Sequence, residues 1–250
     1  MIKEALKYLL DLSIKPDERV VTVEDQMGND HILVIDAEGN SKEIKPLTSN
    51  AKEPLLINTL TGLVEYIKAN IERVDSKFYL QVYDEKNVYL KGTLDINGER
   101  ETLVAVQAIV PKINYGYFQS TEELIITFQS KFVPTKDRDL LLKVVGNVKE
   151  ENVRETGDNG IAQAVTIKTG VASAADVLVP NPVSLAPYRT FLEVEQPASS
   201  FIFRMKDGPS GAIFEADGGA WRNQAIANVR EYLATELESE IEKGRITIIA

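Results

Sequence analysis

The 250-residue chain contains no cysteine and a single histidine, His31. Thiols and imidazoles supply many of the nucleophiles, soft-metal ligands and proton-exchanging groups that enzymes use near neutral pH. The sequence also lacks the Gly-x-x-x-x-Gly-Lys-Ser/Thr and Gly-x-Gly-x-x-Gly phosphate loops, the His-Glu-x-x-His zinc motif and the Gly-x-Ser-x-Gly nucleophile motif. We therefore expect a protein that is not an enzyme and that holds no cofactor.

Basic residues are fewer than acidic ones, 28 against 38, which gives a formal net charge of −10. Because Lys and Arg supply most of the affinity for phosphate backbones, direct nucleic-acid binding requires a local basic cluster. No apolar run approaches the roughly 18 residues of a membrane span. Residues 1–19 are too charged for a signal peptide. We expect a cytoplasmic protein that does not bind membranes.

Changes in composition predict three parts. Residues 1–45 form a small N-terminal region, with an amphipathic helix over 2–12 and a β-hairpin over 19–36. Residues 46–54 are polar and not periodic, which predicts a flexible connector. Residues 55–250 form the main domain.

The main domain is predicted to have an α+β fold in which antiparallel β-meanders pack with four to five helices. A C-terminal amphipathic helix followed by a short strand ends it. The expected elements are a helix over 61–74, strands over 77–83, 87–95 and 99–110, two helices separated by Pro134, strands over 161–168, 188–195, 201–205 and 212–215, the C-terminal helix, and a strand over 245–249.

Apolar residues recur at every fourth position of the C-terminal helix. They are Trp221, Ala225, Val229, Leu233 and Leu237. This spacing keeps one apolar stripe against one neighbour over several turns. We expect the stripe to face the core or a second subunit and not to form a ligand site.

A possible interaction site precedes that helix at Asp217, Gly218, Gly219 and Trp221. Paired glycines let the backbone approach a ligand and leave N–H groups free for an anion. In the alternative interpretation, Asp217 caps the helix, the glycines form the turn and Trp221 anchors the core. The pattern fits both, and the structural interpretation is the simpler.

Asp36, Glu43 and Lys45 form the constellation that most resembles an active site. In some magnesium-dependent nucleases two carboxylates hold the metal, and a lysine stabilises charge or activates water. The same three residues also fit a solvated hairpin and connector, because Asp, Glu and Lys are common around turns. The spacing does not separate the two interpretations.

Several segments between about residues 59 and 240 resemble a family of uncharacterised proteins from tailed phages and prophages of Gram-positive bacteria, and more distantly the YfdQ-like family of unknown function. They are TLTGLVEYI at 59–67, FQSKF at 128–132, DRDLLLKVVGNVKEE at 137–151, PNP at 180–182, PYRTF at 187–191, EVEQP at 193–197 and FEADGGAW at 214–221. The resemblance implies a phage protein made in the bacterial cytoplasm, and it brings no catalytic residue. Asp36, Glu43 and Lys45 lie outside it.

The leading hypothesis is a non-enzymatic phage protein that binds a protein partner. It would serve as an accessory to phage DNA metabolism or as an antagonist of a host enzyme, since an acidic surface can occupy a nucleic-acid site. The alternatives are a self-assembling or virion-associated structural protein and, third, a magnesium-dependent nuclease.

Overall fold

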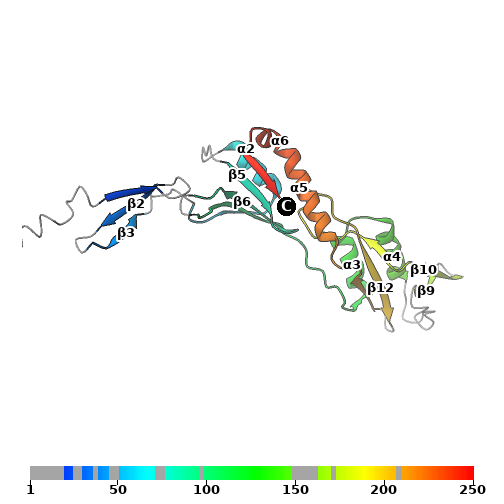
Figure 1. Ribbon diagram of the computed structural model, residues 1–250. Coiled ribbons are helices and arrows are strands. Elements are labelled where there is room, and N and C mark those ends of the chain that lie inside the picture. The colour runs from blue at the N-terminus through cyan, green and yellow to red at the C-terminus, as the bar shows by residue number, and fades with distance from the viewer. Residues whose placement is uncertain are drawn as a thin grey trace, which may run out of the picture. The chain divides into compact units, whose positions relative to one another are not determined.

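The computed structural model describes residues 20–24, 30–35, 39–44, 51–70, 77–95, 98–147, 163–169, 173–206 and 210–250. The chain divides into two compact units (Figure 1). Unit 1 comprises residues 1–52 and 93–101, and unit 2 comprises 53–92 and 102–250. Residues 93–101, which the sequence placed in the main domain, thus belong with the N-terminal region. One contact within unit 1 is a hydrogen bond of 2.8 Å from the Ala51 N–H to the Glu101 carboxylate.

Unit 1 contains a three-stranded antiparallel sheet with the order β1-β2-β3. Its strands are β1 (Val20–Glu24), β2 (Asp30–Ile35) and β3 (Ser41–Ile44). Pairing of Val20 with Val34 confirms the predicted hairpin. β3 pairs with β2 and was not predicted as a strand. The expected helix over 2–12 lies outside the described residues.

Unit 2 has an α+β fold whose first sheet has the order β14-β5-β6-β7-β4. The strands are β4 (Leu55–Ile57), β5 (Phe78–Val82), β6 (Asn87–Gly92), β7 (Thr102–Gln107) and β14 (Ile246–Ile249). β5, β6 and β7 form the predicted antiparallel meander. The edge strands β4 and β14 pair in parallel with β7 and β5, so the sheet is mixed.

Two helices bury their apolar faces against this sheet, α2 (Leu60–Ala69) and α5 (Trp221–Glu236). The Thr59 hydroxyl caps α2 by accepting a hydrogen bond from the Gly62 N–H at 3.1 Å. The helix was predicted to reach residue 74, and this is wrong. It ends at Ala69 because Asn70 adopts a left-handed conformation with φ of 45°, which terminates helices.

The second sheet of unit 2 has the order β11-β12-β13-β8 and packs against two helices. Its strands are β8 (Gln119–Ser120), β11 (Val183–Leu185), β12 (Ser199–Lys206) and β13 (Ser210–Glu215), and the helices are α3 (Thr121–Lys131) and α4 (Lys136–Asn147). As predicted, Pro134 separates the helices, and the Thr135 hydroxyl caps α4 by accepting from the Arg138 N–H at 3.2 Å. Large aromatic side chains, including Phe128, Phe201 and Phe203, fill this second core.

A separate antiparallel hairpin joins β9 (Gln163–Thr169) and β10 (Ser173–Val179). β9 matches the strand predicted over 161–168, whereas β10 was not predicted. The short helix α6 (Glu238–Glu242) was also not predicted, and it brings the helices among the described residues to five, α2 to α6. None of them is long and apolar enough to cross a membrane.

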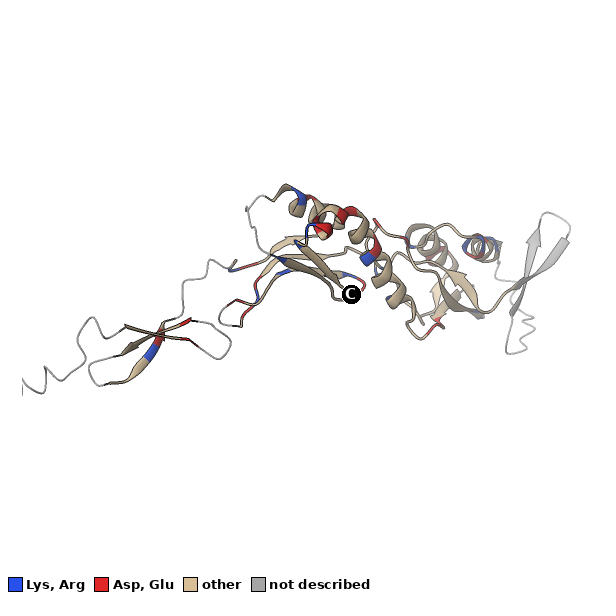
Figure 2. Cartoon of the chain, turned by 45° about the horizontal axis from the view of Figure 1, so that its top comes forward, with Lys and Arg blue, Asp and Glu red and all other residues tan. Residues whose placement is uncertain are grey.

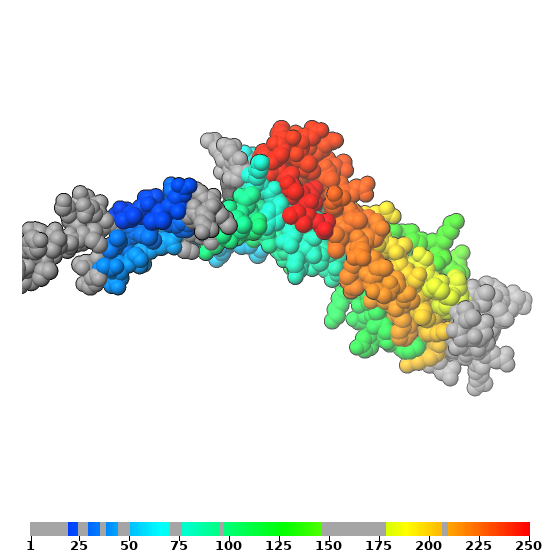
Figure 3. Space-filling model, in the orientation of Figure 1, coloured from blue at the N-terminus to red at the C-terminus, as the bar shows by residue number. Residues whose placement is uncertain are grey.

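α5 contributes to the surface between the two sheets of unit 2, where Figure 3 shows it in orange between the teal and yellow segments. Its predicted stripe is confirmed as buried: Trp221 is 5% exposed, and Ala225, Val229, Leu233 and Leu237 are fully buried. Val229, Leu233 and Leu237 join the first core. Trp221 differs from the other four residues of the stripe, because it also lines the hollow that is described below.

The strand predicted over 188–195 does not form. Tyr188–Glu195 has no regular secondary structure, and Arg189, Thr190 and Phe191 are buried in succession. The Gln196 side chain explains the compact loop. Its carbonyl oxygen accepts from the N–H groups of residues 189 and 190, and its amide donates to the carbonyls of 191 and 194. These bonds replace the ladder of a strand.

Candidate functional site: a hollow around Arg189

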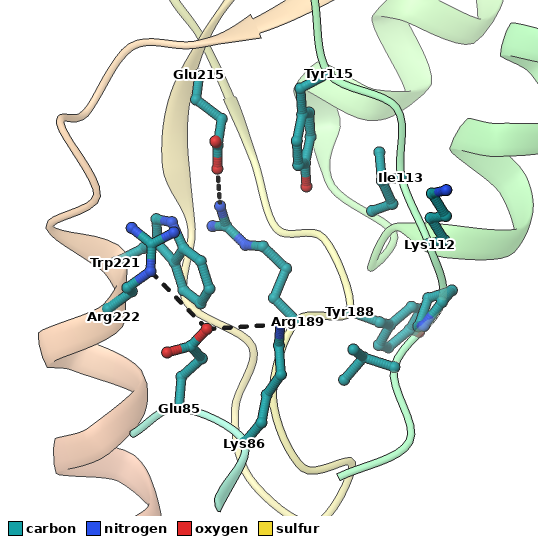
Figure 4. A pocket seen from close by; sticks show the side chains of 12 residues that line it. Glu85, Lys86, Lys112, Ile113, Tyr115, Tyr188, Arg189, Glu215, Trp221 and Arg222 are labelled. Carbon is teal, nitrogen blue, oxygen red and sulfur yellow. Dashed lines mark hydrogen bonds and ion pairs between the residues drawn. The ribbon is translucent and has the colours of Figure 1, made fainter. Parts of the chain in front are cut away.

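A hollow of about 440 Å³ lies in unit 2 where five segments meet (Figure 4). They are the turn before β6, the segment after β7, the loop around Arg189, the end of β13 and the start of α5. The lining residues are Glu85, Lys86, Val110, Pro111, Lys112, Ile113, Tyr115, Tyr188, Arg189, Glu215, Trp221 and Arg222. This volume lies within the range of small-molecule sites.

Arg189 is held in the wall of the hollow and is only 5% exposed. Its Nη1 donates to the Glu215 carboxylate at 3.1 Å. Its Nη2 donates to the Ser199 hydroxyl at 2.7 Å and to the Pro197 carbonyl at 3.3 Å. The Gln196 carbonyl oxygen fixes the backbone of the same residue at 2.9 Å. The guanidinium therefore has a defined position.

Trp221 provides an aromatic surface between two arginines. The guanidinium carbon of Arg189 lies 3.8 Å from the centre of a Trp221 ring, and that of Arg222 lies at 4.8 Å. Such stacking stabilises a buried guanidinium by about 2 kcal/mol when water is excluded. Arg189 also lies 5.7 Å from the Phe201 ring centre. The buried charge is thus supported by π faces as well as by a carboxylate.

Positive charge outnumbers negative charge around the hollow. Four cationic side chains line it, Lys86, Lys112, Arg189 and Arg222, with two acidic ones, Glu85 and Glu215. Glu85 lies 3.6 Å from the Lys86 ammonium and 3.9 Å from Nε of Arg222. Elsewhere charges of both signs are interspersed along the ribbon (Figure 2). A net positive site is notable in a chain of net charge −10.

Three buried polar atoms of the lining have no well-aligned hydrogen-bond partner among the described residues: Nε of Arg189, Nε1 of Trp221 and the Tyr115 hydroxyl, which lies beside Arg189. Burial lowers the pKa of Arg189, and the neighbouring Tyr115 and Glu215 oppose that shift. Burial also raises the pKa of Tyr115 to about 12, so its hydroxyl stays protonated at neutral pH and remains a donor. Figure 4 shows this hydroxyl pointing into the space between Arg189 and Ile113.

The turn before α5 agrees with the structural interpretation in part, because the N-cap residue of α5 is Ala220, without a side-chain cap, and Asp217 bonds to the turn from three residues earlier. The Asp217 carboxylate accepts from the N–H groups of Gly219 at 3.0 Å and Trp221 at 3.3 Å. Gly218 and Gly219 have φ of 62° and 85°, which glycine adopts most easily. Asp217 thus occupies the two N–H groups that an anion would need there. Of the four predicted interaction residues, Trp221 alone lines the hollow.

Asp36 and Lys45 of the predicted metal constellation lie outside the described residues. Glu43 is on β3, and its carboxylate contacts Nδ1 of His31 at 2.6 Å. Within the described part of the chain, no group of three or more His, Cys, Asp or Glu residues is placed to hold a metal ion.

A second feature of unit 2 is an exposed apolar surface on the outer side of the β12–β13 pair. Ile202 pairs with Phe214 across the strands, and the ring centres of Phe118 and Phe214 are 6.4 Å apart. The Lys206 ammonium lies 4.3 Å from the Phe118 ring centre. Tyr117, which precedes Phe118 in the sequence, is 71% exposed. We call these five residues the aromatic face.

Sequence reasoning missed Arg189 and Tyr115 as site residues. Arg189 was placed in the strand predicted over 188–195, which does not form, and no local motif marks either residue. Comparison of the chain with protein-family models, with curated proteins and with solved structures gives no match.

Proposed function

We propose that this chain is a non-enzymatic protein of a tailed phage or prophage that binds a protein partner in the cytoplasm of the bacterial host. It serves there as an accessory to phage DNA metabolism or as an antagonist of a host enzyme. The observation that carries the binding role is the aromatic face. Exposed aromatic side chains are enriched at the centres of protein interfaces.

The exposure of these side chains supports the proposal. Ile202 is 36% exposed although it lies on β12, in the middle of a strand pair, and Phe118, directly before β8, is 39% exposed. The opposite face of β12 packs into the second core, where Phe201 and Phe203 are completely buried. A contiguous apolar surface that its own domain does not cover is typical of an interaction site.

Site-specific photo-crosslinking tests the proposal. A photoreactive phenylalanine analogue replaces Tyr117 in the protein expressed in its host, and a matched variant carries it at Ile126, which is 53% exposed on α3. We expect a discrete adduct with a second protein species from position 117 and not from 126. The substitution Phe118→Glu should abolish that adduct.

The absence of any adduct from position 117 would contradict the proposal. An adduct of two copies of this chain, together with a doubled mass in light scattering, would favour the self-assembling alternative. Magnesium-dependent cleavage of DNA that is lost in Asp36→Ala or Glu43→Ala would contradict the non-enzymatic role and favour the nuclease.

A further inference from the structure

We propose that the hollow around Arg189 binds a small organic anion, in which a carboxylate or phosphate is joined to an apolar body. This ligand site goes beyond the proposed function, because it requires neither a protein partner nor the aromatic face. Three features of the hollow favour such a ligand: the charge of its lining, its buried donors and its apolar wall.

The charge of the lining residues favours the binding of an anion. Glu85 and Glu215 already have basic neighbours, and the lining keeps two more cations than anions. Lys112 is exposed at the rim, and within the described part of the chain its ammonium has no ion pair. Because a concave wall excludes some of the water that would screen these charges, an entering anion meets a stronger attraction than on a flat surface.

The unpartnered donors of the lining favour an acceptor. A buried donor without an acceptor costs about 1–3 kcal/mol, and more for a charged group. Nε of Arg189 and Nε1 of Trp221 are both in this state, and both residues line the same hollow. The Tyr115 hydroxyl lies beside Arg189 and is also sealed from solvent, so a small movement of the Tyr115 ring must admit the ligand oxygen. An oxyanion admitted beside Arg189 would accept from donors that the folded chain leaves unused.

The remaining wall favours an apolar body over a bare inorganic ion. Val110, Pro111 and Ile113 line one side, and the Tyr188 ring adds an aromatic surface. Figure 4 places Ile113 and Tyr188 across the hollow from Trp221. A volume of about 440 Å³ is larger than a bare phosphate or carboxylate needs, and apolar walls with few polar groups are typical of sites for organic ligands.

The chain provides its own reporter, because Trp221 is its single tryptophan. The intact protein is titrated with benzoate and with phenyl phosphate while Trp221 fluorescence is recorded, and a saturable change with Kd near or below about 1 mM is expected for one of them. Benzyl alcohol has a similar ring without the charge and inorganic phosphate has the charge without the ring. Each should bind at least about tenfold more weakly. The better of the two anions identifies the headgroup.

Three variants assign the signal to the hollow. Arg189→Met should weaken binding at least about tenfold, and Lys112→Gln, at an exposed position that folding does not need, about threefold. Arg230→Met is the matched control, because Arg230 is exposed on α5 and does not line this hollow. It should bind like the unmodified protein.

Any one of three results would contradict the site. The first is that Trp221 fluorescence shows no saturable change up to about 20 mM of either anion. The second is that benzyl alcohol binds as tightly as the better anion, and the third is that both Arg189→Met and Lys112→Gln bind that anion like the unmodified protein. Because the titration uses no partner, these failures leave the crosslinking result at Tyr117 intact.

Discussion

The described part of the chain buries charge in two regions, and they are built in opposite ways. At the corner of α6 and β14 the acid is buried: Glu240 is 8% exposed and pairs with Arg245 at 2.6 Å and Lys243 at 3.1 Å. In the loop over 188–198 the base is buried, and its partner Glu215 is 36% exposed.

The difference lies in whether the residue with the unused donor lines a hollow. Nε of Arg245, like that of Arg189, has no partner among the described residues. A second hollow, of about 370 Å³, is lined by neighbours such as Gly244 and Ile246, but Arg245 is not among its lining residues. Nη2 of Arg245 donates to the Asn70 side chain at 3.3 Å and so ties the C-terminal corner to the end of α2. The Glu240 cluster is therefore a structural clamp, whereas the Arg189 cluster faces a space that a ligand can enter.

The largest effect is expected from Gln196→Ala, which removes the side chain that organises the Arg189 loop. Four buried backbone groups would lose a hydrogen bond, and we expect the free energy of unfolding to fall by about 3 kcal/mol. Denaturant unfolding measures it. Gln224→Ala on the exposed side of α5 is the control and should change stability by less than about 0.5 kcal/mol. A loss below about 1 kcal/mol in Gln196→Ala would mean that the loop is held by its apolar residues instead.

Glu240→Ala should cost about 2 kcal/mol, because it leaves the partly buried Arg245 without its carboxylate. The control is Glu236→Ala, since Glu236 pairs with Lys68 at the surface and should contribute less than about 0.5 kcal/mol. Equal effects of the two substitutions would show that the corner is not a clamp.

Acid should weaken the same clamp. The hydrogen bond from Lys243, with help from Arg245, holds the pKa of Glu240 below its usual value of 4.5. A lowered pKa in the folded state means that the carboxylate stabilises the fold above pH 4.5, and that this contribution disappears as pH falls through the lowered value. Unfolding curves of Glu240→Gln should therefore depend less steeply on pH below 4.5 than those of the unmodified protein. Parallel pH profiles would contradict this.

A smaller effect is expected from Tyr115→Phe in alkali. The pKa of Tyr115 is about 12 in the folded chain against an ordinary 10, so the unfolded chain loses this proton first, and stability falls as pH rises from 10 to 12. Tyr115→Phe removes that contribution and should flatten the alkaline limb. An unchanged limb would show that Tyr115 is solvated.

Elements with local signals in the sequence could be predicted, and elements that depend on long-range contacts could not. The α5 stripe, the helices α3 and α4, the β5–β6–β7 meander and the last strand, β14, have local periodicity or turn signals, and they were predicted. β4 was not predicted, and neither was the parallel pairing of β4 and β14, because parallel pairing joins segments far apart in the chain and leaves no turn to recognise. The loop over 188–198 alternates like a strand, but tertiary bonds from Gln196 override that pattern.

The candidate site was predicted only through Trp221. Its other members, such as Arg189, Tyr115 and Lys112, come from different segments, and each is unremarkable in its own segment. Only the folded chain brings them together. Buried polar residues are a property of the tertiary structure that composition does not reveal.

The most direct test of the difference between clamp and site is thermal unfolding with and without the better-binding anion. Ligand at about ten times its Kd should stabilise the folded protein by about 1.4 kcal/mol, because it binds only the folded state. We expect a full shift of Tm in the unmodified protein and in Glu240→Ala. In Arg189→Met, whose binding is at least about tenfold weaker, the stabilisation should fall to about 0.4 kcal/mol or less. An undiminished shift in Arg189→Met, or the absence of a shift in the unmodified protein, would contradict the assignment of the Arg189 hollow as a ligand site.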